Sequence, residues 1–218
     1  MQEIIVCLIS FLIAAFAFGF GAAKLFKKKK PLYLQLLVCA AGCFALQQLS
    51  NAVNLWCEIK EPVSVGMFGI FGCNFFLLSA NFGTLDRIVD DGENTGKARK
   101  AAFAAPAVMA LLAAAVFFSW IEKDTFCAVM WLIMLLPALP ASYYNLKHIL
   151  LPTDPFGFLS ATRSCNVAAL VLYFVMAVYA FFSASAGVIL CGCSSVLMSL
   201  SVLCLALCAV KGAEKWGI

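Results

Sequence analysis

Seven long apolar stretches, separated by short polar segments, fill almost the whole chain. A transmembrane helix needs about 20 apolar residues to cross the hydrocarbon core of a bilayer, and each stretch is close to that length. The pattern therefore predicts an all-α, polytopic membrane protein, with a single bundle of seven transmembrane helices forming one domain over residues 1–218. The expected spans are residues 4–26, 31–56, 64–86, 101–121, 126–145, 164–182 and 188–210.

The composition supports this class and excludes a soluble domain. The 218 residues are 64% hydrophobic and 12% charged, whereas soluble domains are about 45–50% apolar and about 25% charged. Nine of the eleven cysteines fall inside apolar stretches, where cysteine behaves as a small hydrophobic residue. Cys57 and Cys127 lie near the predicted outer surface, and the sequence leaves open whether they form a disulfide. Because no Cys-x-x-Cys pair is present, we expect no metal site and no cofactor.

The distribution of basic residues predicts the orientation. With seven spans, thirteen of the fifteen lysines and arginines fall on the side of the C-terminus, and Lys60 and Lys123 fall on the other side. Basic residues are enriched in cytoplasmic loops, so we expect the N-terminus outside and the C-terminus in the cytoplasm, in the plasma membrane. The bases lie in loops and belong to no basic and aromatic module, so nucleic-acid binding is not expected.

Uncharged polar side chains enter the second and third spans. Gln47, Asn51 and Asn54 stand at i, i+4 and i+7 and share one helical face, and Asn74 and Asn81, seven residues apart, share another. In antiparallel neighbouring spans, Gln47 and Asn74 would both lie about 14–15 Å from the outer surface, at a depth where they can meet. These amides either clamp the two helices together or form the polar wall of an outward-facing pocket for a small neutral or amphipathic ligand.

A cluster of charged residues ends the third span, formed by Asp86, Arg87, Asp90 and Asp91. Carboxylates at a helix C-terminus are unfavourable by about 0.3–1 kcal/mol each, so they need compensating cations. The lysines of residues 27–30 and the bases of residues 97–100 should lie on the same side of the membrane, and we expect the carboxylates to pair with them. A bistable switch and a metal site are the alternative interpretations of this cluster.

Two prolines and one histidine distinguish the fifth span. Pro137 and Pro140 each remove a backbone hydrogen bond, so we expect kinks whose freed carbonyls find partners on neighbouring helices. His148, the only histidine, is expected at the inner end of this span, where a cation favours the helix C-terminus. With this single histidine and no Gly-x-Ser-x-Gly motif, the sequence offers no recognisable catalytic constellation.

The end of the third span and the overall plan resemble known receptors. Asp86-Arg87 is similar to the Asp-Arg pair of rhodopsin-like receptors, although the Asn-Pro-x-x-Tyr motif of their seventh span is absent. Seven spans without large loops and with an outer N-terminus also resemble, in architecture, the membrane modules of bacterial sensor proteins. The sequence therefore favours a receptor-like or regulatory module that relays a signal to a cytoplasmic or membrane partner protein through the Asp86 end.

Two other functions stay open. The first is a carrier of small solutes or lipids, in which the kinked fifth span and the amide-bearing helices form the path. The second is a lipid-modifying enzyme. Asp91-Gly92 before Ala98-Arg99 resembles the core motif of CDP-alcohol phosphatidyltransferases, but five residues separate the pairs where that family has two. The later Gly-x-x-x-Asp-x-x-x-Asp part of that motif is missing as well.

Overall fold

The computed structural model describes residues 2–26, 31–59, 65–86, 96–151, 157–185 and 188–215. Within these ranges the elements are all helices, which confirms the predicted all-α class for the described part of the chain. The helices are α1 (Gln2–Leu25), α2 (Leu32–Trp56), α3 (Met67–Leu78), the π-helical segment η1 (Ser79–Leu85), α5 (Gly96–Ala102), α6 (Ala104–Ile121), α7 (Thr125–Leu135), α8 (Ala138–Leu150), α9 (Phe158–Ser185) and α10 (Val188–Lys215).

Six helical segments in the described ranges are long and apolar enough to cross a membrane, and a further apolar helix, Met67–Gly83, is shorter. The six are Glu3–Leu25, Leu32–Trp56, Gly96–Ile121, Thr125–Leu150, Leu159–Ala184 and Ile189–Lys215. The helices thus support a multi-pass membrane protein, whereas the count of seven crossings and the orientation stay predictions. The helices of the fourth to seventh predicted spans extend beyond the predicted bounds, because the polar residues at their ends continue the helix.

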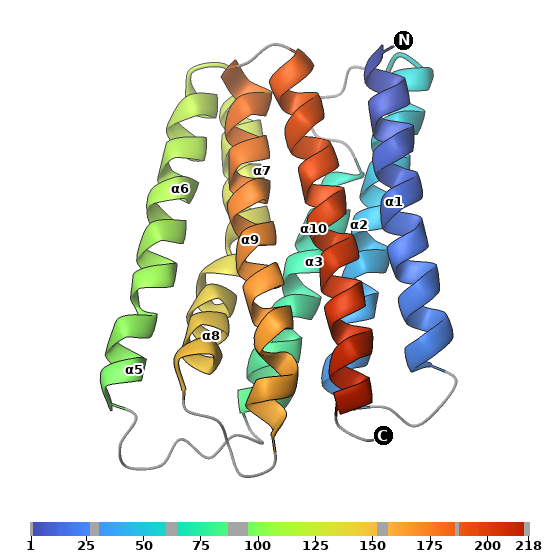
Figure 1. Ribbon diagram of the computed structural model, residues 1–218. Helices are drawn as coiled ribbons and strands as arrows, with labels where there is room; N and C mark the ends of the chain where they lie inside the picture. The colour runs from blue at the N-terminus through green and yellow to red at the C-terminus, as the bar shows by residue number, and fades with distance from the viewer. Residues whose placement is uncertain are drawn as a thin grey trace.

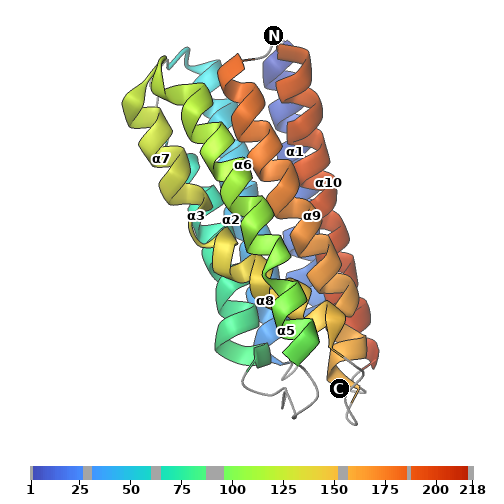
Figure 2. The same ribbon diagram turned by 90° about the vertical axis from the view of Figure 1, so that its left-hand side faces the viewer.

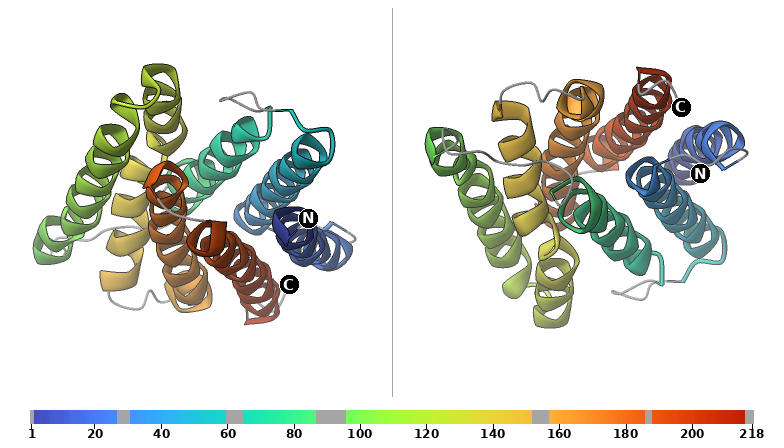
Figure 3. Two further views of the ribbon diagram at one scale, coloured as in Figure 1. Left: turned by 90° about the horizontal axis from the view of Figure 1, so that it is seen from above. Right: turned by 90° about the horizontal axis from the view of Figure 1, so that it is seen from below.

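The long helices run side by side, and the two ends of the chain lie at opposite ends of the bundle (Figure 1). We call these the N-terminal end and the C-terminal end of the bundle. α1 packs on α2 and α10, α2 packs on α3, and α6 packs on α7, α8 and α9. Figure 2 shows α1 and α10 as neighbours, and in Figure 3 α6 lies across the bundle from α1. α3 begins below the upper ends of α2 and α9 in Figure 1 and leads into η1 near the C-terminal end.

Large apolar side chains cover the outside of the bundle. Leu12, Leu46, Leu111 and Phe118 are between 63 and 72% exposed. Many alanines, such as Ala14, are fully buried, and small residues let the backbones of membrane helices approach closely. An apolar surface of this kind suits contact with lipid, whereas in water it would mark an aggregation-prone patch.

Glycines bring α3 close to α2. Gly66, Gly69 and Gly72 recur every third residue and all face α2. A Cβ atom added at Gly69 would lie 2.5 Å from Cβ of Gln47 and 2.6 Å from the backbone oxygen of Cys43. No side chain fits in that space, so the contact fixes which face of α3 is turned toward α2.

The fifth predicted span is interrupted once, at Leu136 and Pro137, between α7 and α8. Pro137 precedes the first residue of α8, and its missing N–H prevents the ladder of hydrogen bonds from continuing. Pro140 lies in the first turn of α8, where the N–H groups have no partner within the helix. The helix is therefore interrupted at Pro137 and continues through Pro140, whereas kinks were expected at both prolines.

Candidate functional site

The predicted pairing of Gln47 with Asn74 is absent. Asn74 donates from Nδ2 to the backbone oxygen of Met134, at 2.9 Å. Met134 lies in the last turn of α7, whose carbonyls lack the next helical turn because the helix is interrupted. Asn74 comes five residues after Gly69, about 140° further around the helix. With Gly69 against α2, Asn74 faces α7, so equal depth did not bring the two amides together.

Gln47 instead belongs to a buried polar chain that links three helices. Nε2 of Gln48 donates to Oε1 of Gln47 at 3.3 Å. Oγ of Ser195, on α10, lies 3.3 Å from Oε1 of Gln48 and 3.2 Å from Oγ of Ser10 on α1. All four residues are buried. Gln48, Ser10 and Ser195 were not predicted as site residues, although a hydroxyl or amide within an apolar stretch was the available signal.

A cavity of about 1140 Å³ lies at the N-terminal end, between α1, α2, α9 and α10. Asn51 and Asn54, two of the predicted pocket residues, line it from α2, and Ser195 lines it from α10. Gln47, Asn74 and the other predicted amide, Asn81, are not among its lining residues. The wall also contains apolar residues and thiols, among them Val6, Leu55, Ile189, Val196, Cys7 and Cys191. Small-molecule sites typically have about 300–1,000 Å³ and the same mixture of apolar wall and few polar groups.

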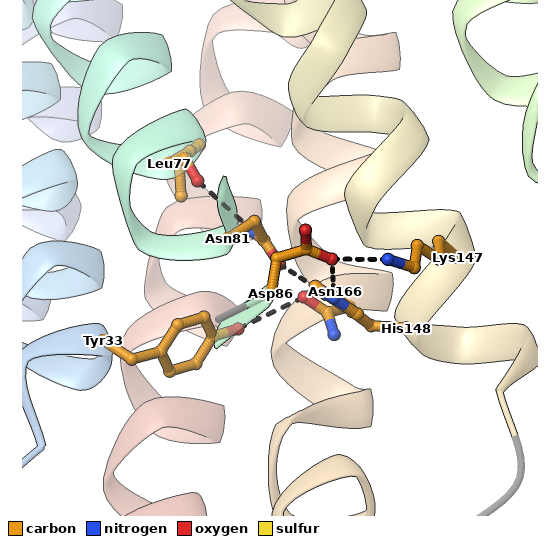
Figure 4. Close-up of polar contacts among 7 residues, drawn as sticks. All are labelled: Tyr33, Leu77, Asn81, Asp86, Lys147, His148 and Asn166. Atoms are coloured by element: carbon orange, nitrogen blue, oxygen red, sulfur yellow. Dashed lines mark hydrogen bonds and ion pairs between the residues drawn. The ribbon is translucent and has the colours of Figure 1, made fainter. Parts of the chain in front are cut away.

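A second group of polar residues joins η1 to α8 near the C-terminal end (Figure 4). Nζ of Lys147 lies 2.6 Å from Oδ1 of Asp86, and Nε2 of His148 lies 3.3 Å from the same oxygen. Nδ1 of His148 lies 3.2 Å from Oδ1 of Asn81, whose Nδ2 donates to the backbone oxygen of Leu77 at 3.3 Å. We call Asn81, Asp86, Lys147 and His148 the η1–α8 cluster.

The η1–α8 cluster corrects two predictions. Among the described residues, Asp86 takes its partners Lys147 and His148 from α8, and not from the bases of residues 97–100 that were expected to neutralise it. His148 lies in the last turn of α8 as expected, but it is fully buried and bonded on both ring nitrogens. The other three charged residues of the predicted cluster lie outside the described residues, and so do residues 27–30. The three are Arg87, Asp90 and Asp91.

The π-helical turn explains why Asn81 and Asp86 face the same helix. Residues five apart in an α-helix are rotated by about 140°, which would direct one of these side chains away from α8. In a π-helix the hydrogen bonds run from i to i+5, so residues five apart come to the same side. Such insertions in α-helices are frequent at functional sites, and no sequence pattern predicted this one.

Opposite charges keep Asp86 ionised. Asp86 follows the apolar helix Met67–Gly83 and lies outside it. Burial by itself would raise the pKa of this carboxyl, but the hydrogen bonds from His148 and Lys147 outweigh burial and hold the pKa below its ordinary value. Nζ of Lys147 also lies 5.9 Å from the centre of the Tyr144 ring, a cation–π contact worth about 0.5–1 kcal/mol at an exposed site.

Several buried polar atoms of the described residues lack a hydrogen bond within the protein. Among them are Oδ1 of Asn74, both amide atoms of Asn145, Nδ2 of Asn166 and the hydroxyl of Tyr173. The Tyr173 hydroxyl and Asn145 are close enough to interact, but without normal hydrogen-bond geometry. Oδ1 of Asn166 accepts from the Tyr33 hydroxyl at 3.2 Å. An unsatisfied buried polar group costs about 1–3 kcal/mol, and water or a polar ligand that bonds to these atoms would offset that cost.

The described residues contain no group of three His, Cys, Asp or Glu side chains placed to hold a metal ion. All eleven cysteines are free thiols, including Cys57, which is exposed, and Cys127, which is buried. Comparisons with protein-family models, with curated proteins and with solved structures find no match to this chain.

Proposed function

We propose that the protein is a receptor-like membrane module that binds a small neutral or amphipathic ligand in the cavity at its N-terminal end. The cavity, with Asn51 and Asn54 on one wall, is the observation that carries this proposal. In the proposed arrangement the chain crosses the plasma membrane seven times, with the N-terminus outside, so that the cavity opens toward the exterior.

The lining determines the class of ligand. Among the described residues that line the cavity, Glu3 alone is charged, and the other polar groups are amides, hydroxyls and thiols. Asn51 and Asn54 can donate and accept hydrogen bonds, which fixes the orientation of a polar head group, while the apolar wall holds a hydrocarbon part. A strongly charged ligand would leave its charge poorly compensated in these surroundings.

The route to the other end of the bundle runs through α2 and α3. Asn51 and Asn54 lie on α2, and the glycine contact couples α2 rigidly to α3. α3 leads directly into η1 and the η1–α8 cluster. The neighbouring helix α5 exposes Lys97, Arg99 and Lys100. In our proposal a partner protein with an acidic surface binds this end of the bundle and responds to a shift of these helices.

Replacement of both cavity amides should remove the bound molecule. We expect Asn51→Leu/Asn54→Leu to weaken ligand binding by a factor of about 5–140, because two good hydrogen bonds contribute about 1–3 kcal/mol together and 1.4 kcal/mol is a factor of ten. Native mass spectrometry of protein extracted with its lipids would measure the occupancy. Val53→Leu, on the exposed side of the same turn of α2, is the control. Equal occupancy in the three proteins would contradict the proposal.

The row of unsatisfied polar atoms favours a carrier as the second candidate. These atoms on Asn74, Asn145 and Tyr173 are buried and would offer hydrogen bonds to a passing solute. In liposomes, Asn74→Leu is then expected to abolish uptake of labelled neutral solutes or lipids, whereas Phe75→Leu at the adjacent exposed position should not. Uptake by wild-type protein no greater than by empty liposomes would reject the carrier. No observation favours the lipid-modifying enzyme.

A further inference from the structure

Two neighbouring side chains of α8 and α9 keep all their side-chain polar atoms without a hydrogen bond inside the described part of the protein. These atoms are Nδ2 and Oδ1 of Asn145, on α8, and the hydroxyl of Tyr173, on α9. Both residues are fully buried, at 0% exposure. The two groups are close enough to interact, but they do not meet with normal hydrogen-bond geometry. A direct bond between the two side chains therefore does not satisfy them.

The surroundings of this pair are apolar and closed to bulk solvent. One turn to either side along α9, Ala169, Met176 and Ala177 are at most 1% exposed. On the side of α3, the fully buried thiol of Cys73 lies close enough to Tyr173 to interact with it. A thiol is only a weak hydrogen-bond donor and acceptor. The amide and the hydroxyl thus form a small polar site where α3, α8 and α9 come together.

The unpaired atoms determine what kind of molecule fits this site. An asparagine amide both donates and accepts hydrogen bonds, and so does a tyrosine hydroxyl. This holds whichever way the amide of Asn145 is turned. A cation would find two oxygen atoms and no compensating carboxylate on the pair, whereas buried cations need several oxygen ligands or an opposite charge. The matching partner is a small neutral molecule that donates and accepts at the same time.

Water is the molecule of this class that suits a fully buried site. A buried water typically makes about three hydrogen bonds to polar groups that would otherwise be unsatisfied, and three unpaired atoms are present here. We propose that Asn145 and Tyr173 form an internal water-binding site, in which the bound water bridges the amide of α8 to the hydroxyl of α9.

The position of the site gives the bridge a role in holding α8. This helix begins after the interruption at Pro137, so the hydrogen bonds of α7 do not continue into it. On one side, the ion pair of Lys147 with Asp86 ties α8 to the end of η1. The water bridge ties α8 to α9 on another side. This inference depends neither on ligand binding in the cavity at the N-terminal end nor on the passage of a solute.

X-ray radiolysis followed by mass spectrometry tests for the water itself, because hydroxyl radicals formed from a bound water oxidise the side chains beside it. Full-length protein in detergent is irradiated, and oxidation of Tyr173 is compared with that of Phe44, which is equally buried and has no polar group. We expect oxidation of Tyr173 above that of Phe44, and loss of this difference in Asn145→Leu. Oxidation of Tyr173 no greater than that of Phe44 in the wild-type protein, or unchanged in the variant, would overturn the inference.

Thermal denaturation tests the bridge with a milder change. Tyr173→Phe keeps the ring and removes only the hydroxyl. We expect its Tm to fall by about 2–4 °C, the shift that the loss of one hydrogen bond produces in a protein of this size. A hydroxyl without any partner would be costly to bury, so its removal would leave Tm unchanged or raise it. Either of those two results would contradict the proposed bridge.

A double variant shows whether the two side chains share one water. Asn145→Leu/Tyr173→Phe should lower Tm by less than the sum of the two single changes, because each single change already disrupts the same bridge. Additive losses would count against a shared water. If Asn145→Leu does not fold, the Tm of Tyr173→Phe and the oxidation of the wild-type protein decide the matter.

Discussion

Replacing Asp86 with alanine is expected to lower the free energy of unfolding at pH 7 by about 3 kcal/mol, the lower end of the range for breaking a buried ion pair. The side chain of Lys147 is 6% exposed and that of Asp86 is 22% exposed, so the ion pair is largely shielded from water. His148 loses an acceptor in the same step. Denaturation of the purified protein in detergent, followed by tryptophan fluorescence, would measure the loss.

Two further variants show whether burial of the charge is the cause. Glu214→Ala removes an exposed carboxylate at the end of α10 and should change stability by no more than about 0.5 kcal/mol. Asp86→Ala/Lys147→Met removes both charges and should recover part of the loss, because no buried ammonium is left without this partner. If Asp86→Ala is as mild as Glu214→Ala, the pair contributes nothing to the junction of η1 and α8.

Replacing Gly69 with alanine is expected to lower the free energy of unfolding by about 1–3 kcal/mol, the usual result of overpacking. The new methyl group would meet the backbone oxygen of Cys43 and the Cβ atom of Gln47 closer than 3 Å, and neither belongs to a flexible chain end. α3 would have to move away from α2. Guanidinium or thermal denaturation in detergent would record the change.

Gly19→Ala is the matched control for this prediction. Gly19 also lies within a helix, but a Cβ atom added there meets nothing within 4 Å. Alanine favours a helix over glycine by up to about 1 kcal/mol, so this variant should be neutral or more stable than the wild type. Equal stability of the Gly69 and Gly19 variants would mean that close packing of α2 on α3 does not hold the bundle.

The class of the protein could be predicted because it depends on local sequence. A run of about 20 apolar residues has to be a helix in a membrane, since no water is there to satisfy an exposed backbone. The interruption between α7 and α8 was similarly visible, because Pro137 carries no N–H wherever the chain places it. Asn51 and Asn54 were chosen for sharing a helical face, and both line the cavity.

The contacts of the polar residues were decided by the tertiary structure. Gln47 and Asn74 were matched by depth alone, whereas Gly69 sets the rotation of α3 and turns Asn74 toward α7. Asp86 meets Lys147 and His148, more than sixty residues further along the chain. Two side chains can bond only if depth, rotation and distance all agree. The position of a residue along its span supplies the first of these, but the rotation of each helix follows from its packing and from the π-helical turn of η1.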